Sequence, residues 1–264
     1  MFVAITQKTL HPMKQLWTFG LEEAKSCFFA VIIFSTLAIT QIMETLFIPR
    51  YDFILLICLL TQAFMMITKM ETWDEVKVIG VFHVIGLALE IYKVHMGSWS
   101  YPEEAWSKVF GVPLYSGFMY ASVASYLCQA WRRLDVEIVH WPKTWAVFLL
   151  SAAIYFNFFT HHYIYDFRWL LKIATILLFF RTIVYFKVNA ITYKMPVVLA
   201  FVLIGFFIWI AENIATFFGG AWQYPNQSET WHIVHFSKIS SWLLLVIVSF
   251  LIVAMLKHIK GKRE

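Results

Sequence analysis

The chain has 264 residues, of which 61% are hydrophobic and only 14% charged, and its net charge is +5. Soluble globular domains carry about 25% charged residues, so this composition excludes a soluble protein and predicts one that lies in a membrane. The lysines and arginines stand mainly between apolar stretches and at the chain ends, as topology signals do, which argues against a nucleic-acid partner. All three cysteines lie within apolar stretches and predict neither a disulfide framework nor a redox motif.

Apolar stretches of membrane-spanning length recur along most of the chain. Residues 1–23 mix polar and aromatic side chains and predict an interfacial N-terminal segment. Beyond them the runs have the length of about 17–25 residues that a spanning helix needs, rather than the roughly 10-residue alternation of a membrane barrel. We predict an all-α, polytopic membrane protein with eight transmembrane helices, at residues 24–43, 53–68, 76–92, 113–131, 144–160, 168–187, 195–218 and 236–257.

The basic residues are distributed unevenly between the two sides of the predicted bundle. Of the lysines and arginines in the connections and at the ends, thirteen fall on one side and four on the other. The positive-inside rule then predicts a bacterial-type plasma-membrane protein with both termini in the cytoplasm. The first apolar run is too long for a signal peptide and has no cleavage site after it, so we expect it to remain as a span.

Three features occur twice along the chain in the same order. Tyr-Asp-Phe opens the second and sixth predicted spans, a glutamate lies near the outer end of the third and seventh, and Trp-x-Tyr-Pro follows each glutamate. We therefore predict two four-helix repeats within one membrane domain, residues 24–131 and 144–257. An even number of spans gives both halves the same orientation, so we expect an axis along the membrane normal and a shared site between the halves. Asp52 and Asp166, within the Tyr-Asp-Phe pair, are expected to cap helix N-termini.

The two repeated glutamates are the first candidates for chemistry. Glu90 shares one helical face with His83 and Gly86, and Glu212 lies deeper in its span beside Asn213. Ionisable groups in a membrane cost about 2.5–3.5 kcal/mol on insertion scales and mark functional sites by default. The alternative for Glu90 is an ion pair with Lys93 that anchors the helix near the interface.

Burial disfavours the charged form of a carboxyl, so each glutamate would be an acid in reserve. Such an acid could protonate an alkene or an oxygen, or it could load and unload protons during transport, and the sequence does not choose between these. We take Glu90, Glu212 and Asn213 as the candidate catalytic residues.

The two Trp-x-Tyr-Pro loops supply the candidate substrate-binding residues. These are Trp99 and Tyr101 in the first loop and Trp222 and Tyr224 in the second, together with His83. Aromatic residues gather at membrane interfaces and proline stops helices, which is the simpler explanation for one loop alone. Their repetition after a glutamate favours a site, because aromatic faces attract a developing carbocation and stack on the ring of a lipid-soluble substrate.

The remaining motifs argue against a metal or cofactor. Six histidines could gather on the outer side to bind a metal ion. Their number and spacing instead favour interfacial hydrogen bonding over a metal site. No phosphate-binding glycine loop, Ser-His-Asp order or aspartate-rich prenyl-diphosphate motif is present in the sequence. We therefore expect no metal and no cofactor; the six histidines are His83, His95, His161, His162, His232 and His235.

Several stretches of the chain carry a resemblance to a known family. LEIYKVHMGSWSYPE, VPLYSGFMYASVASYL, IYFNFFTHHYIYDFRWLL, WIAENIATFFGGAWQYPNQ and SSWLLLVIVSF resemble the YoaT-like family of bacterial integral membrane proteins, a domain of unknown function. This resemblance covers nearly the whole chain beyond about residue 20. It implies a membrane location and no particular activity.

A second, weaker resemblance concerns the first repeat. Glu90 followed by Gly97-Ser98-Trp99-Ser100-Tyr101-Pro102, and then by Gly111-Val112-Pro113-Leu114, is similar to the repeats of heterodimer-type lycopene cyclases and carotenoid hydratases. That resemblance implies proton-initiated chemistry on isoprenoid double bonds, with Glu90 and Glu212 as acids and the loop aromatics along a polyene pocket. The cyclase pattern has paired acidic residues after its Gly-x-Pro, where this chain has Leu114-Tyr115-Ser116.

Three functions remain open at this point. The first is binding of a lipophilic, isoprenoid-like molecule near the outer leaflet, with acid catalysis by Glu90 and Glu212. The alternative is a transporter or permease that uses the same glutamates as a proton or substrate relay, and the third is a structural or assembly protein. The expected partners are the lipid bilayer and a lipophilic small molecule, and the sequence carries no signal for an oligomeric state.

Overall fold

The structure is a computed structural model that describes residues 12–43, 47–161, 163–217, 222–224, 233–234 and 237–260. Within these residues the chain is mostly helical and carries two small antiparallel sheets, which the all-α prediction did not include. The helices are α1 (Pro12–Ser26), α2 (Phe28–Ile42), α3 (Arg50–Ile67), α4 (Trp73–His95), α5 (Tyr115–Arg133), α6 (Thr144–Thr160), α7 (Arg168–Phe179), α8 (Val197–Phe217) and α9 (Ser237–Lys260). The strands are β1 (Lys108–Val109), β2 (Val112–Pro113), β3 (Glu137–Val139), β4 (Ile183–Val188) and β5 (Ile191–Pro196).

Three helices of the described residues, α3, α4 and α8, are long and apolar enough to cross a membrane. The pair α1 and α2 meets the same test together, with a bend of 68° between them, so the number rises to four if this pair forms one span. These helices identify a membrane protein. The further spans of the eight-helix prediction remain predictions.

The sixth predicted span, residues 168–187, is wrong in its second half. The helix α7 ends at Phe179 after 12 residues, and β4 follows from Ile183. Twelve helical residues cover only about 18 Å, well short of a hydrocarbon core of about 30 Å. The sequence Ile-Val-Tyr-Phe-Lys-Val is rich in β-branched and aromatic residues, which fit a strand better than a helix.

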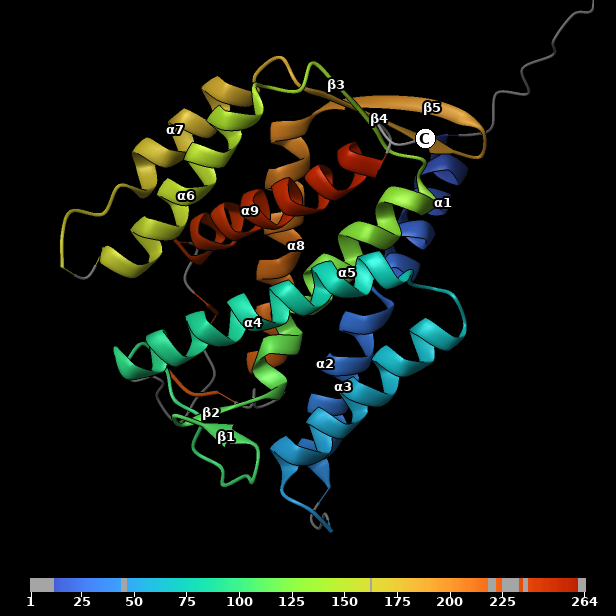
Figure 1. Cartoon of the computed structure of the whole chain (residues 1–264). Helices are drawn as coiled ribbons and strands as arrows, with labels where there is room; N and C mark the ends of the chain where they lie inside the picture. Colours follow the sequence, from blue (N-terminus) through green and yellow to red (C-terminus); the bar gives the residue numbers. More distant parts are fainter. Residues whose placement is uncertain are drawn as a thin grey trace, which may run out of the picture.

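The two sheets lie at opposite ends of the molecule (Figure 1). The three-stranded sheet β3-β4-β5 gathers with α1 at one end, and the β1–β2 hairpin lies at the other. A tight turn joins β4 to β5 through Asn189 and Ala190, whose φ angles are 49° and 64°. Two successive left-handed residues match the turn that a two-residue hairpin favours.

Helices α4 and α5 pack closely because each presents a glycine to the other. A methyl group at Gly86 of α4 would lie 2.6 Å from Cβ of Tyr120, and one at Gly117 of α5 would lie 2.8 Å from the backbone oxygen of His83. Both distances are too short for real carbon atoms. The glycines therefore set how near the two helices approach, and they fix where Tyr120 and His83 lie.

A buried ionic cluster fastens the connection between α3 and α4 onto α5. Glu75 accepts from the backbone of Thr72 in a capping box and forms an ion pair with Arg132 at 3.2 Å. Glu71 accepts from Ser125 and from Gln62, and burial raises the pKa of this carboxyl. Since both carboxylates are 4% exposed or less, the cluster holds this end of the α4–α5 pair firmly.

The apolar core has two parts. One is built mainly from α5 to α9, and the other from α2, α3 and the residues around Tyr101 and Tyr115. Phe118 packs against both parts, and Trp222 packs against the second. A residue from the C-terminal half of the chain thus contributes to the core of the N-terminal half.

Candidate functional site

The carboxyl of Glu90 is buried and accepts three hydrogen bonds from aromatic side chains. Glu90 lies in the last turns of α4 and is 3% exposed. Its Oε2 accepts from Nε1 of Trp99 at 2.7 Å and from the hydroxyl of Tyr101 at 2.8 Å, and its Oε1 accepts from the hydroxyl of Tyr120 at 2.8 Å. A buried carboxyl needs such partners, because its transfer from water to the protein interior without hydrogen bonds costs roughly several kcal/mol of free energy.

The end of α4 explains why the first Trp-x-Tyr-Pro loop returns to Glu90. Gly97 has a φ of 68°, its N–H donates to Val94, and the N–H of Ser98 donates to Lys93. These two bonds with a left-handed glycine form a Schellman motif, which reverses the chain after a helix. The reversal places the indole of Trp99 and the phenol of Tyr101 over the last turns of the helix they follow.

Glu212 has a similar surrounding near the end of α8. It is 5% exposed, its Oε1 accepts from the hydroxyl of Tyr224 at 2.5 Å, and its Oε2 accepts from Nε1 of Trp242 at 2.5 Å. Tyr120 stands 30 residues after Glu90, and Trp242 stands 30 residues after Glu212. Each carboxyl therefore accepts hydrogen bonds from at least one aromatic side chain of the loop that follows its helix, and from one aromatic side chain of the next helix.

The two loops meet through their middle residues. The N–H of Ser100 donates to the carbonyl of Gln223 at 2.9 Å, and the N–H of Gln223 donates to the carbonyl of Ser100 at 2.8 Å. The rings of Trp99 and Tyr224 lie in a T-shaped contact with centroids 6.2 Å apart. We call this meeting point, with Glu90, Glu212 and their aromatic donors, the loop junction.

Five of the eight residues predicted from the sequence belong to the loop junction: Glu90, Glu212, Trp99, Tyr101 and Tyr224. Trp222 packs against the second part of the core, and His83 and Asn213 lie elsewhere. His83 is two turns from Glu90, and its ring packs on Phe118 with centroids 4.4 Å apart. Asn213 accepts from the backbone N–H of Val234 at 2.9 Å and donates to the carbonyl of Trp209 at 2.8 Å, so its amide holds the backbone near Val234.

Sequence analysis missed two members of the loop junction, Tyr120 and Trp242. The signal that identifies them is the spacing of 30 residues from each glutamate, which becomes visible only once the glutamates are aligned. Neither residue shares its type with its counterpart, so a search for repeated motifs passes over both. What they share is a donor group that reaches a carboxyl.

The two Tyr-Asp-Phe aspartates have different roles. The N-cap of α3 is Pro49, and Asp52 instead accepts from the backbone of Trp106 and Ser107 at 2.8 and 2.9 Å, so its predicted capping role is wrong. Asp166 precedes α7 and accepts from the backbone N–H of Arg168 at 3.0 Å, in the manner of a cap. Although burial acts in the opposite direction, hydrogen bonds from Arg168 lower the pKa of Asp166 to about 2.

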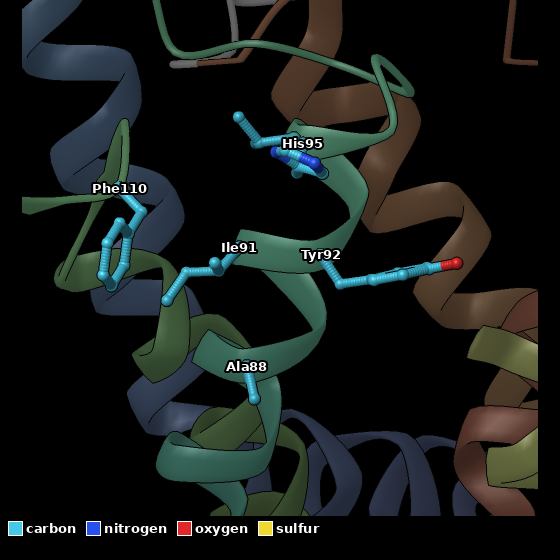
Figure 2. Close-up of a pocket in the computed structure, with 6 residues that line it drawn as sticks. Ala88, Ile91, Tyr92, His95 and Phe110 are labelled. Carbon is cyan, nitrogen blue, oxygen red and sulfur yellow. The ribbon is translucent and has the colours of Figure 1, made fainter.

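A hollow lies on another face of α4, near its C-terminal end (Figure 2). It is open to one side and has a volume of about 630 Å³. Figure 2 shows Ile91 pointing from α4 toward Phe110 of the β1–β2 turn, with Ala88 one turn below. The lining is apolar except at one end, and it consists of Ala88, Ile91, Tyr92, Val94, His95 and Phe110.

Among the described residues, no group of three or more histidines, cysteines or acidic residues is arranged to hold a metal ion. His162, His232 and His235 lie outside the described residues. His161 directs Nδ1 at the carbonyl of Asn157 at 3.1 Å, a contact within its own helix end.

A comparison with protein families decides the relationship of the chain. The family described as "Protein of unknown function (DUF817)" matches residues 15–250. The chain belongs to this family. The chain is also similar to the "Uncharacterized protein YoaT" of Bacillus subtilis (strain 168), with 64% identity over 251 residues that cover 95% of each chain. The predicted YoaT-like membership is confirmed, and the likeness to carotenoid enzymes stays a resemblance.

One solved structure also resembles this DUF817 chain. It is described as a cross-linked MvINS trimer, and the alignment covers 71% of this chain and 95% of that chain. The identity is 15% and the TM-score is 0.49, at which the likeness carries no argument about fold or function.

Proposed function

We propose that the chain is a multi-pass plasma-membrane protein built from two related halves, with both termini in the cytoplasm. The positions of the buried donors support the two halves. Glu90 and Glu212 are 122 residues apart, and Tyr120 and Trp242 are the same distance apart. An origin of these pairs from one duplicated unit explains why four residues that are distant in sequence make two similar clusters.

We infer that the function of the protein is proton-coupled transport, with the loop junction as the place where protons are bound. The observation that carries this inference is the pair of buried carboxyls, Glu90 and Glu212, each of which accepts a hydrogen bond from at least one phenol. The loops that follow their two helices meet at Ser100 and Gln223. Ionisable groups inside membrane bundles commonly serve proton relays. The interface of two parallel repeats is also where transporters hold their substrate and coupling ions.

The donor types at the loop junction suit a proton relay. A phenol can donate or accept a hydrogen bond, whereas an indole N–H can only donate. When a carboxyl takes up a proton, Tyr101, Tyr120 or Tyr224 can turn its hydroxyl and accept from the new O–H. The indoles of Trp99 and Trp242 keep their direction and hold each carboxyl in place.

Protonation at the loop junction would change the contact between the halves. A neutral carboxyl binds its donors less strongly than a carboxylate, so the clusters loosen when they are protonated. Protonation then favours a conformation that exposes the site to the other side of the membrane. The size of this shift is set by the difference in proton affinity between the two conformations. Proton binding is thereby coupled to the movement of one half against the other.

Proton flux into vesicles tests this function. The purified protein is reconstituted into liposomes that contain a pH-sensitive dye, and a potassium diffusion potential drives protons inward. We expect flux above that of protein-free liposomes, and a loss of about tenfold or more in Glu90→Gln and in Glu212→Gln, since glutamine keeps the shape but binds no proton. Glu104→Gln, the same change at an exposed residue of the outer loop, is the control and should leave flux unchanged. Equal flux in all four proteins, or none above protein-free liposomes, would count against proton transport.

A second candidate function, binding of a lipophilic molecule near the outer leaflet, is favoured by the hollow on α4. Its apolar lining from Ala88 to Val94 suits a chain or ring, and His95 supplies a polar group at one end. Glu90 lies on a different face of the same helix, with its oxygens engaged by three donors. Acid catalysis on a molecule in the hollow would therefore require one of these donors to leave the carboxyl first.

Lipid extraction with native mass spectrometry tests this second function. We expect an isoprenoid or quinone-like molecule to copurify with the wild-type protein in stoichiometric amount and to be lost from Ala88→Phe, which fills the hollow. Val84→Phe is the matched control, because Val84 is exposed on the same helix one turn earlier. If the same phospholipids accompany all three proteins, the hollow holds no specific ligand.

A further inference from the structure

Helix α1 presents a continuous apolar stripe that no part of the described chain covers. Met13 is 69% exposed, Leu16 66%, Trp17 69% and Leu21 41%. Their spacing of three and four residues puts them on one side of a helix. Gly20 and Ala24, which are also exposed, fall on the same side.

The opposite face of α1 is fully engaged. Asn189 of the β4–β5 turn donates to Gln15 at 3.3 Å and to Thr18 at 3.1 Å, and the rings of Phe19 and Phe186 lie 5.5 Å apart. Glu23 accepts from Tyr126 of α5 at 2.7 Å. These contacts fix the rotation of α1, so the helix cannot turn its apolar stripe toward the protein.

The bend between α1 and α2 explains how such a helix meets a bilayer. The two axes differ by 68°, and α2 is strongly apolar whereas α1 carries charges along its length. If α2 stands upright in the hydrocarbon, α1 lies close to the membrane plane. An amphipathic helix in this position buries its apolar face at the boundary between headgroups and acyl chains.

The charges beside the stripe indicate which lipids it meets. Lys14 and Lys25 are exposed and lie on the same flank of the stripe, one near each end of the helix, and Lys25 also pairs with Glu22 at 2.6 Å. Arg133 of α5 is nearby, at 3.5 Å from Glu22. Cationic side chains next to an apolar face attract anionic headgroups, which are abundant on the cytoplasmic leaflet.

We propose that α1 is an interfacial anchor that inserts Met13, Leu16, Trp17 and Leu21 into the inner leaflet and binds anionic phospholipid headgroups through Lys14 and Lys25. The three-stranded sheet serves as its support, through Asn189 and Phe186. The anchor does not depend on proton transport, and it takes only its cytoplasmic location from the topology proposed above.

Spin labels on the full-length protein test the anchor. The three native cysteines are replaced, a nitroxide is attached at Leu16→Cys or at Glu104→Cys, and the protein is reconstituted in phosphatidylcholine with or without phosphatidylglycerol. We expect the label at position 16 to be several-fold more accessible to dissolved oxygen than to a water-soluble nickel complex, and the label at position 104 to show the reverse. Phosphatidylglycerol should raise the ratio at position 16 further.

The variant Lys14→Gln/Lys25→Gln separates the apolar and ionic parts of the proposal. It should keep the label at position 16 in the bilayer but remove the effect of phosphatidylglycerol, with an unchanged melting temperature as the check on folding. A label at position 16 as exposed to nickel as the one at position 104 overturns insertion. A ratio that is the same with and without phosphatidylglycerol in the wild-type background overturns anionic recognition.

Discussion

At the scale of single residues, the loop junction shows how a membrane protein keeps carboxyls in its interior. Glu90 and Glu212 are each surrounded by N–H and O–H donors of aromatic side chains, which bring their own apolar surface with them. An aromatic donor satisfies a carboxylate and at the same time packs against its apolar neighbours. The two carboxyls are thereby surrounded by the apolar surface of the aromatic side chains that donate to them.

Removing one of these donors should lower stability without changing shape. Tyr120→Phe deletes only the hydroxyl that donates to Glu90, and hydrogen bonds to charged groups contribute about 1.5–3 kcal/mol. We expect a loss of that size in the free energy of unfolding, measured in detergent micelles with urea. Tyr163→Phe is the control, since Tyr163 is 71% exposed and its hydroxyl donates to the sulfur of Met96 at the protein surface. Equal stability of the two variants would contradict the role of Tyr120.

The low pKa of Asp166 predicts how stability depends on acid. A carboxyl with a depressed pKa stabilises the fold fully above its unfolded pKa of about 3.9, and this contribution is lost as the pH falls toward its folded pKa. For Asp166 the folded pKa is about 2, so the loss should occur between about pH 4 and pH 2. Melting temperatures across this range should fall more steeply for the wild type than for Asp166→Asn. Parallel curves for the wild type and Asp166→Asn across this range would contradict the role of Asp166.

The residues of the site could be predicted only where both repeats have the same residue type at the same position. The glutamates and the loop aromatics belong to a motif that occurs twice, so the repetition identifies them. Tyr120 and Trp242 perform one task with two different side chains, and no rule of local sequence links them to a glutamate 30 residues earlier. His83 shares a helical face with Glu90, but a shared face extends over several turns and does not place a residue at the same depth.

At the scale of elements, the pair α4 and α5 depends on close backbone approach. Gly86 faces Tyr120, and Gly117 faces His83, so each glycine leaves room for one ring from the other helix. Small residues allow this kind of approach in membrane helices, where the apolar effect does not drive helices together. The same approach carries the hydroxyl of Tyr120 to Glu90.

Gly86→Ala should therefore disturb both packing and the loop junction. The new methyl group would lie 2.6 Å from Cβ of Tyr120, and overpacking of this kind costs about 1–3 kcal/mol. The melting temperature and the proton flux should both fall. Gly80→Ala is a matched control on the same helix, because nothing lies within 4 Å of its added methyl group, and it should be neutral or slightly stabilising. A similar loss in both variants would contradict the close approach of Gly86 to Tyr120 as the cause.

The hairpin β4–β5 shows where reading by apolar length fails. Residues 168–187 are apolar enough over a spanning length, yet the helix stops at Phe179. The feature that distinguishes the strand is the change from mixed apolar residues to a run of β-branched and aromatic ones, followed by Asn189 and Ala190 in left-handed conformations. A window of about 20 residues averages over that change.

At the scale of the whole molecule, the elements sort into two ends. The three-stranded sheet and α1 lie at one end, and the β1–β2 hairpin lies at the other (Figure 1). Lysines of α1 and of the β4–β5 hairpin belong to the first end, in agreement with a cytoplasmic assignment by the positive-inside rule. The chain order alone predicted this separation, although the three-stranded sheet at the end with α1 was not foreseen.

Labelling of introduced cysteines tests the orientation. In a variant without native cysteines, Glu104→Cys should react with a membrane-impermeant maleimide on intact cells, because the proposed topology places its loop outside. Ala190→Cys, in the β4–β5 turn, should react only after the cells are permeabilised. The opposite pattern would invert the proposed topology, and reaction of both on intact cells would place both ends outside.

The bond between Ser100 and Gln223 has a consequence for how the protein is made. The three aromatic donors to Glu90 have been synthesised once Tyr120 is added, but Gln223, the partner of Ser100, is synthesised 123 residues after Ser100. At roughly 5–20 residues per second this is a delay of about 6 to 25 s. For that period the first loop presents an unpaired N–H and C=O, so the nascent chain passes through a half-built state that is open to water or to a chaperone.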